Sequence, residues 1–261
     1  MPRRFRFLLV SILSAILFLI FIAIPYEWRY WALAMDVLLL IVLVWWGLMM
    51  KKGMPLLLRL MTVFLPIGFF IGYGLFVAII PYNFIAGLIE SIFFGTIIYI
   101  IFLVQNVFLF AVGYKTVPLY RAAYTMGSIL MLLTTFFLFD SLFSFNLNYW
   151  LNMIFVFVIC MLIFAYHFFS VSIELPDDGK NLDIRSYIMV PAFIMSQLAL
   201  VFSFWPVGIF KGSIYLTAII YIIAGLIQSD IRGRLFRRTI LSFLWIGVAV
   251  VLGIILMTGW R

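Results

Sequence analysis

The stretch MPRRFRFLLVSILSAILFLIFIAIP, residues 1–25, decides the fold class, because a basic start leads directly into a largely apolar run. The run is about 18 residues or more, close to the length of a helix that crosses a bilayer. No A-x-A cleavage site directly follows it, so we interpret it as a membrane span that is retained rather than as a signal peptide. Similar runs recur along the rest of the chain.

The composition of the 261-residue chain excludes a water-soluble fold. Hydrophobic residues make up 67% and charged residues 10%, whereas soluble domains have roughly half and about a quarter. Strand-like alternation is absent, and the strands of a transmembrane barrel would give a weaker apolar signal. We therefore predict an all-α fold, a polytopic transmembrane helix bundle that forms a single integral membrane domain over residues 1–261. We expect a multi-pass protein of the inner (plasma) membrane, with the lipid bilayer as its surroundings.

Runs of about 20 mostly apolar residues predict nine spans. They cover about 6–24, 30–50, 55–80, 84–112, 122–144, 149–170, 187–205, 212–228 and 239–258. The fourth run is the longest, and two arrangements of it are open. It either tilts as one helix or breaks near Gln105 and Asn106, which would leave residues 107–121 along the membrane interface.

The distribution of basic residues predicts the orientation. With a cytoplasmic N-terminus and nine spans, fourteen of the 17 Lys and Arg residues lie on the cytoplasmic side, namely Arg3, Arg4, Arg6, Lys51, Lys52, Arg59, Lys115, Arg121, Lys180, Arg185, Arg232, Arg234, Arg237 and Arg238. Only Arg29, Lys211 and Arg261 lie on the other side. Cytoplasmic loops carry an excess of Lys and Arg, so we predict that the N-terminus is cytoplasmic and the C-terminus is outside.

Aromatic residues agree with this orientation. The stretches PYEWRYW (25–31), NYW (148–150) and FWP (204–206) all fall at the predicted outer boundary. Amphipathic rings concentrate at membrane interfaces. These stretches therefore mark the outer ends of the spans.

The net charge of +8 points to lipid rather than to nucleic acid, because the basic residues lie at the ends of apolar runs. Anionic headgroups on the cytoplasmic side are the expected partner. The strongest basic cluster lies between the eighth and ninth spans, and we interpret it as a lipid anchor. It comprises Arg232, Arg234, Arg237 and Arg238. The sequence identifies no protein partner.

Motifs of catalysis and cofactor binding are not found in the sequence. There is no G-x-x-x-x-G-K-[ST] loop and no strand followed by a G-x-G-x-x-G turn, so nucleotide chemistry is not supported. His167 and Cys160 are the only residues of their types, which excludes a histidine-based or cysteine-rich zinc site. The nucleophile elbow G-x-S-x-G is missing as well. We therefore expect no enzyme activity, no cofactor and no metal.

Three acidic residues fall inside predicted spans and are the candidates for a ligand or ion pathway: Asp36, Glu90 and Asp140. Asp140 interrupts the apolar stretch LTTFFLFDSLFSF (133–145). At a rise of 1.5 Å per residue, the three lie within about 6–9 Å of the outer ends of three different spans. Intramembrane carboxylates are costly and mark functional sites by default.

Two interpretations of these acids are open. In the first, each carboxylate is close enough to the surface to reach water or headgroups, or to pair with Arg29 or Lys211. In the second, the three acids line an outward-facing cavity that admits a cation or a proton. The second interpretation requires that the three helices bring their acids together.

Two stretches, QNVFLFAVGYKTVPLYRAAYTMGSIL (105–130) and FWPVGIFKGSIYLTAIIYIIAGLI (204–227), resemble a family of multi-spanning bacterial inner-membrane proteins of unknown function. The resemblance covers most of the chain, and it implies a bacterial inner-membrane protein. Its motifs are not catalytic, so it assigns no functional residues.

Three classes of function follow from these observations. The best supported is a small transporter or permeation protein, because of the intramembrane acids and the lack of a soluble domain. A scaffold or assembly subunit of a membrane complex is the first alternative, since the loops are too small to bind much on their own. A membrane enzyme that acts on a lipid-linked substrate is the second alternative.

Overall fold

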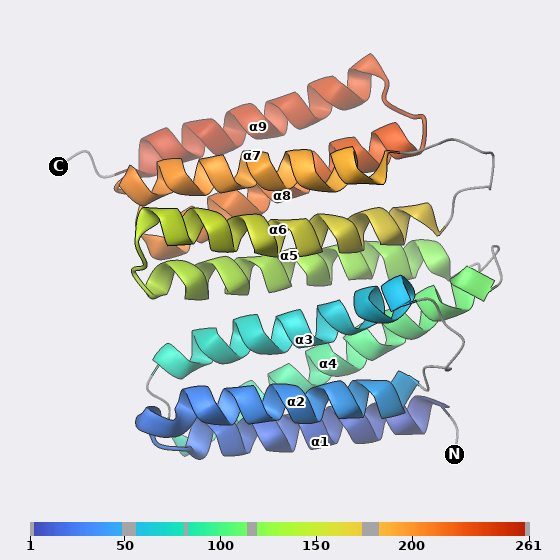
Figure 1. Cartoon of the computed structure of the whole chain (residues 1–261), viewed down its shortest axis with the longest axis vertical. Helices are drawn as coiled ribbons and strands as arrows, with labels where there is room; N and C mark the ends of the chain where they lie inside the picture. Colours follow the sequence, from blue (N-terminus) through green and yellow to red (C-terminus); the bar gives the residue numbers. More distant parts are fainter. Residues whose placement is uncertain (1–2, 49–55, 81–82, 114–118, 174–182, 259–261) are drawn as a thin grey trace. The chain divides into compact units, whose positions relative to one another are not determined.

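The computed structural model describes residues 3–48, 56–80, 83–113, 119–173 and 183–258. Within these ranges the chain forms nine α-helices and one short 3-10 helix, and no strand (Figure 1). They are α1 (Arg3–Ala23), η1 (Tyr26–Trp28), α2 (Arg29–Leu48), α3 (Leu56–Ile79), α4 (Phe84–Gly113), α5 (Tyr120–Ser144), α6 (Tyr149–Ser172), α7 (Ile184–Phe204), α8 (Ile209–Ile231) and α9 (Arg237–Met257).

All nine α-helices of the described part are long and apolar enough to cross a membrane. This confirms the prediction of a polytopic helical membrane protein, and each helix lies over one predicted span. The fourth helix continues unbroken through Gln105 and Asn106 for 30 residues, so the interfacial break does not occur there. A helix of this length is about 45 Å long and exceeds the roughly 30 Å hydrocarbon core, which a tilt accommodates.

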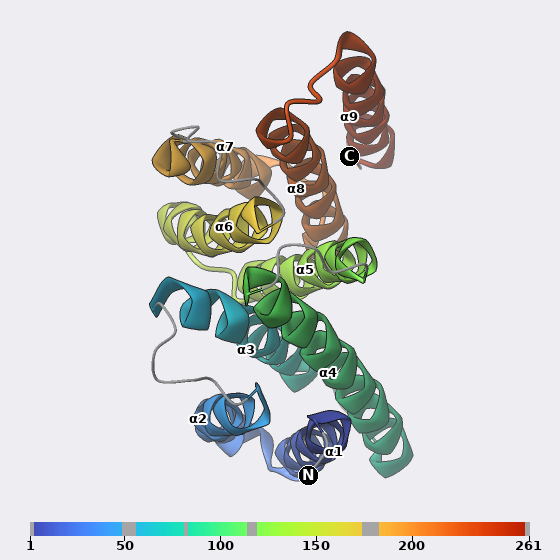
Figure 2. The same cartoon turned by 90° about the vertical axis from the view of Figure 1, so that its right-hand side faces the viewer.

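The chain divides into two compact units, residues 1–134 and residues 135–261, with the boundary inside α5. In the first unit α1 packs against α2 and α4, and α3 packs against α2 and α4. Figure 2 shows α4 running obliquely past α1. The two helices approach closely at Gly95, where an added Cβ would lie 2.9 Å from Ala15 Cβ. Small residues at such crossings let helix backbones approach.

An aromatic core joins α1, α3 and α4 in the first unit. The ring of Phe18 stacks on Phe94 with centroids 4.4 Å apart and on Tyr73 at 5.4 Å. Phe69 stacks on Tyr73 at 5.5 Å. These contacts fix the position of Tyr73, which matters for one of the intramembrane acids.

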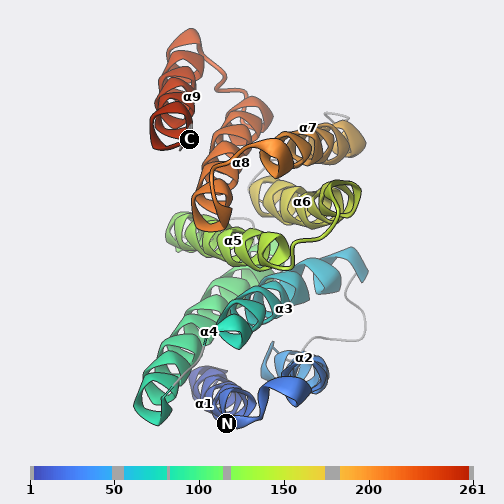
Figure 3. The same ribbon diagram turned by 90° about the vertical axis from the view of Figure 1, so that its left-hand side faces the viewer.

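In the second unit α6 packs along α7, and both contact α8. Helix α9 packs mainly on α8, and none of its described residues is buried. Figure 3 shows α6 beside α7 and α9 beside α8. Helix α7 ends at Phe204, since Trp205 precedes Pro206 and a residue before proline is disfavoured in the helical conformation. The turn that follows carries Gly208 at φ +83° into α8.

Candidate functional site

The structure divides the three predicted acids between the two units. Asp36 on α2 and Glu90 on α4 are half-buried in the first unit, while Asp140 on α5 is buried in the second. The convergence of the three carboxylates therefore stays a prediction. Within the two units, Glu90 and Asp140 have clearly different surroundings.

Glu90 has a partner inside its own unit. The Tyr73 hydroxyl on α3 donates a hydrogen bond to the Glu90 carboxylate on α4. Tyr73 is buried and held by the aromatic core. Neither interpretation of the sequence anticipated this pair, because its two residues lie on different helices.

Arg29 and Lys211, the basic residues that could have paired with the acids, donate to backbone oxygens instead. Arg29 donates to the carbonyl oxygens of Ile24 (3.1 Å), Ala78 (3.0 Å) and Ile22 (3.4 Å). Lys211 Nζ lies 3.4 Å from the carbonyl oxygen of Met257. These oxygens belong to the C-terminal ends of α1, α3 and α9, where unpaired carbonyls favour cations.

Asp140 is the acid whose hydrogen bonding is incomplete. Its side chain is only 7% exposed, and its Oδ1 has no hydrogen-bond partner. The hydroxyl of Ser213 on α8 lies within hydrogen-bonding reach of the carboxylate. That hydroxyl, however, donates to the carbonyl oxygen of Ile209 at 2.9 Å. A hydroxyl has one proton to donate, so Ser213 cannot serve both acceptors at once.

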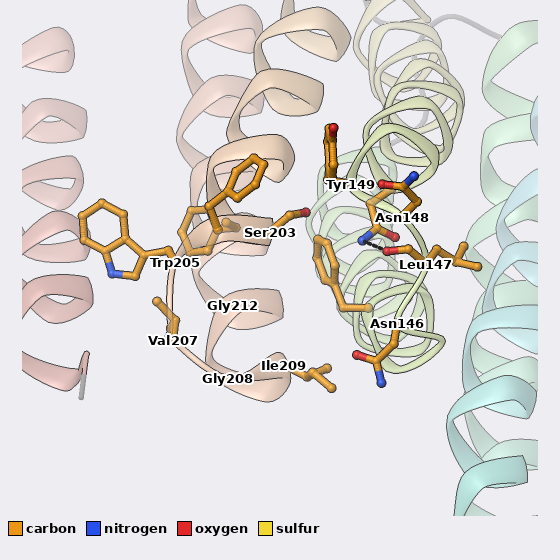
Figure 4. Close-up of a pocket in the computed structure, with 14 residues that line it drawn as sticks. Asn146, Leu147, Asn148, Tyr149, Ser203, Trp205, Val207, Gly208, Ile209 and Gly212 are labelled. Carbon is orange, nitrogen blue, oxygen red and sulfur yellow. Dashed lines mark hydrogen bonds between the residues drawn. The ribbon is translucent and has the colours of Figure 1, made fainter. Parts of the chain in front are cut away.

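A cavity of about 410 Å³ lies at one end of the second unit, where the α5–α6 and α7–α8 turns meet (Figure 4). This is the end that we predict to face outward. Among the described residues that line the cavity, none carries a formal charge. The polar ones are Asn146, Asn148, Asn152 and Ser203, and the aromatic ones are Phe143, Tyr149, Phe202, Phe204 and Trp205. Cavities of about 300–1,000 Å³ are typical of small-molecule sites.

Asp140 and Ser213 are close in sequence to residues that line this cavity, although neither lines it itself. Phe143, which lines it, follows Asp140 by three residues on α5, a rise of about 4.5 Å. Gly212 lines the cavity as well and immediately precedes Ser213 on α8. Along α5, Asp140 is therefore within about one helical turn of a residue of the cavity wall.

The asparagines of the cavity come from the segment NLNYWLN (146–152). Asn152 Nδ2 donates to the carbonyl oxygen of Leu147 at 3.3 Å (Figure 4), and its Oδ1 is buried with no hydrogen-bond partner. Asn148 occupies the N-cap position of α6, but its side chain makes no capping hydrogen bond. Asn146 has φ +48°, a left-handed conformation that asparagine tolerates in turns.

The wall of the cavity that is formed by the end of α7 contacts both the end of α9 and the start of α6. The Trp205 indole Nε1 donates to the Thr258 hydroxyl at 2.9 Å, and Tyr149 packs on Phe204 with ring centroids 5.2 Å apart. Tyr149 and Trp205 were predicted from the sequence to be interfacial aromatics, but the asparagines were not predicted to belong to a site. Three asparagines within seven residues, directly after an apolar run, were the signal that could have identified them.

The predicted lipid anchor is accessible. Arg234, Arg237 and Arg238 are exposed, and Arg232 is half-buried. Among the described residues, no group of three or more His, Cys, Asp or Glu side chains could hold a metal ion.

No protein-family model matches the chain. No curated protein and no solved structure gives a significant match either.

Proposed function

We propose that the chain is a small transporter or permeation protein of the bacterial inner membrane, with Asp140 as the group that exchanges a proton or a cation. One observation carries the proposal: a buried carboxylate with an unpartnered oxygen lies within about one helical turn of a cavity. The cavity supplies an access route from the predicted outer side. The carboxylate supplies a place where positive charge is stabilised.

The energetics of burial support this role for Asp140. A charged aspartate at the centre of a spanning helix costs about 2.5–3.5 kcal/mol on insertion scales. Asp140 lies four residues from the end of α5 at Ser144, about 6 Å at 1.5 Å per residue, so part of this cost persists. Protonation or a bound cation removes it, whereas the Ser213 hydroxyl alone does not complete the hydrogen bonding.

The test measures proton movement into liposomes that contain the purified protein. A pH-sensitive dye inside the vesicles reports proton entry after a membrane potential is imposed. Asp140→Asn keeps the size of the side chain but removes the titratable group, and we expect it to abolish proton entry. The matched control is Asp230→Asn in the same unit, because Asp230 is exposed. In the native protein the Tyr187 hydroxyl donates a hydrogen bond to the Asp230 carboxylate at 2.6 Å, and the amide oxygen of the Asn variant can still accept it.

Proton entry that is equal in both variants, or no entry beyond that of empty liposomes for the unmodified protein, would contradict the proposal. A sodium or potassium gradient in place of the potential tests cation exchange by the same comparison. Loss of entry in Asp140→Asn alone, with both variants folded, supports it.

A scaffold subunit is the second candidate, and α9 is the observation that favours it. Trp245 and Leu256 of α9 are 68% and 82% exposed, so much of this helix is free to contact a neighbouring membrane protein or lipid. Photo-reactive residues at these two positions, activated in native membranes, distinguish the candidates. A discrete protein adduct would support the scaffold, and lipid adducts alone would support the transporter.

A further inference from the structure

We propose that the cavity of the second unit binds a neutral ligand that carries several hydroxyl groups, such as a sugar ring or another polyol. This inference rests on the proposed function, for which it names the class of substrate. It is drawn from three features of the cavity wall: its lack of charge, its incompletely bonded amides, and its open backbone surface.

The absence of charge among the described lining residues disfavours an ionic ligand. A charged group that leaves water without a counter-charge pays a large desolvation cost. Asp140 does not line the cavity. A neutral polar ligand is the class that such a wall accepts.

The amides of α6 supply complementary donors and acceptors. A side-chain amide offers two N–H donors and a carbonyl acceptor, and a hydroxyl can both donate and accept. Asn152 is only 6% exposed, and its Oδ1 lacks a donor. Its amide is held in one orientation because Nδ2 donates to Leu147. The Asn152 Oδ1 therefore lacks a hydrogen-bond donor, and a ligand hydroxyl can provide one.

Two further polar groups face the same space. The Asn148 side chain makes no capping hydrogen bond to α6. Ser203 on α7 donates to the carbonyl oxygen of Ala199 at 2.9 Å, so its oxygen keeps the capacity to accept. Figure 4 shows Ser203 pointing toward the start of α6, where Asn148 and Tyr149 lie. The polar groups therefore come from two helices and can engage more than one hydroxyl.

The glycine wall leaves room for a ring. A Cβ added at Gly212 would meet only Phe202 Cδ1, at the ordinary contact distance of 3.7 Å, and one added at Gly208 would meet nothing within 4 Å. A ligand ring can thus approach the backbone of the α7–α8 turn. Tyr149 and Trp205 provide aromatic surface for its C–H groups.

The experiment titrates the full-length protein in phosphatidylcholine nanodiscs and follows tryptophan emission, which avoids detergents with sugar headgroups. Three probes are used: glucose, glucuronate, and a monoglucosyl diacylglycerol incorporated in the disc. We expect a saturable response to glucose or to the glucosyl lipid, and the arm that responds identifies a free solute or a lipid headgroup as the source. Glucuronate, which keeps the ring hydroxyls of glucose but carries a carboxylate in place of the C6 hydroxymethyl group, should bind at least tenfold more weakly than glucose.

Gly212→Leu should abolish the response because its side chain fills part of the cavity. If Gly212→Leu impairs folding, Gly212→Ala replaces it as the test, and we expect this smaller change to weaken the response. Gly247→Leu on α9 is the matched control, since a Cβ there meets only Ile222 Cδ1 at 3.9 Å and Gly247 does not line this cavity. Asn152→Leu should weaken binding about tenfold or more, which corresponds to about 1.4 kcal/mol or more.

A linear, non-saturating response to both neutral probes, or equal binding by Gly212→Leu and the unmodified protein, would overturn the ligand class. Two further outcomes separate this inference from the proposed function. Saturable binding without Asp140-dependent ion movement contradicts the transporter alone. Asp140-dependent ion movement without saturable binding contradicts the ligand class alone.

Discussion

The Tyr73 hydroxyl on α3 donates a hydrogen bond to the Glu90 carboxylate on α4, and this pair joins two helices inside the first unit. A hydrogen bond to a charged group contributes about 1.5–3 kcal/mol. We therefore expect Tyr73→Phe to lower the free energy of unfolding by about that amount. An SDS titration in mixed micelles measures it.

Tyr99→Phe is the matched control for this prediction. Tyr99 lies on the same helix as Glu90, and its hydroxyl makes no hydrogen bond to the described residues. Because Tyr99→Phe removes no hydrogen bond and leaves the half-buried ring in place, it should change the free energy of unfolding by less than about 0.5 kcal/mol. Equal effects of Tyr73→Phe and Tyr99→Phe would show that the Glu90 contact contributes nothing particular.

The helices could be predicted from the sequence because their signal is local. Apolar length alone identified nine spans, and of the two arrangements left open for the fourth run the structure has the unbroken helix. The partners of the polar residues could not be predicted in this way. Glu90 meets Tyr73, 17 residues earlier, and Arg29 meets Ala78, 49 residues later. Such pairings depend on how helices pack, which apolar runs do not encode.

The same distinction between local and long-range features applies to the candidate site. Asp140 was identified from sequence, because a carboxylate within an apolar run is conspicuous. The cavity was not identified, since it forms only where the turn after Ser144 meets the turn after Phe204. The run of asparagines at 146–152 could have drawn attention to Asn152, but its burial with an unpartnered Oδ1 is seen only in the structure.

Helix α9 approaches α8 closely at Gly225, which gives a second prediction. A Cβ added at Gly225 would overlap the ring of Phe243. We expect Gly225→Ala to destabilise the docking of α9 by about 1–3 kcal/mol, the usual range for overpacking, despite a gain of about 1 kcal/mol in helix propensity. Hydrogen exchange of the α9 amides should rise accordingly.

Gly247→Ala is the control for α9, because the new methyl group meets only Ile222 Cδ1 at 3.9 Å and the gain in helix propensity is the same. Phe243→Leu should relieve part of the Gly225→Ala effect, since the two positions are in contact and their effects are not additive. Unchanged exchange in Gly225→Ala would mean that the ring moves aside without cost.

The orientation gives a third prediction, from the distribution of fourteen basic residues against three. A reporter that is active only in the cytoplasm should be active when fused after Gly233, between α8 and α9. The same reporter fused after Arg261 should be silent, because one more span separates the two positions. The reverse pattern would contradict the predicted orientation, including the outward location of the cavity.

The basic segment between α8 and α9 gives the last prediction. Arg237 and Arg238 occupy the first turn of α9, where the helix dipole disfavours cations by about 0.3–1 kcal/mol each at the surface. Their exposure leaves them free to meet anionic headgroups, which attract each basic residue by about 1 kcal/mol. The attraction outweighs or offsets the unfavourable dipole term.

Replacement of Arg232, Arg234, Arg237 and Arg238 by Gln should therefore reduce the anionic lipid that stays bound on purification, measured by mass spectrometry of extracted lipid. Replacement of the same four by Lys is the matched control, since it keeps the charge and removes only the planar guanidinium fork. Retention with Lys and loss with Gln would establish a charge-based anchor. Loss in both variants would point instead to bidentate recognition of phosphate, and unchanged lipid in both would exclude an anchoring role for this segment.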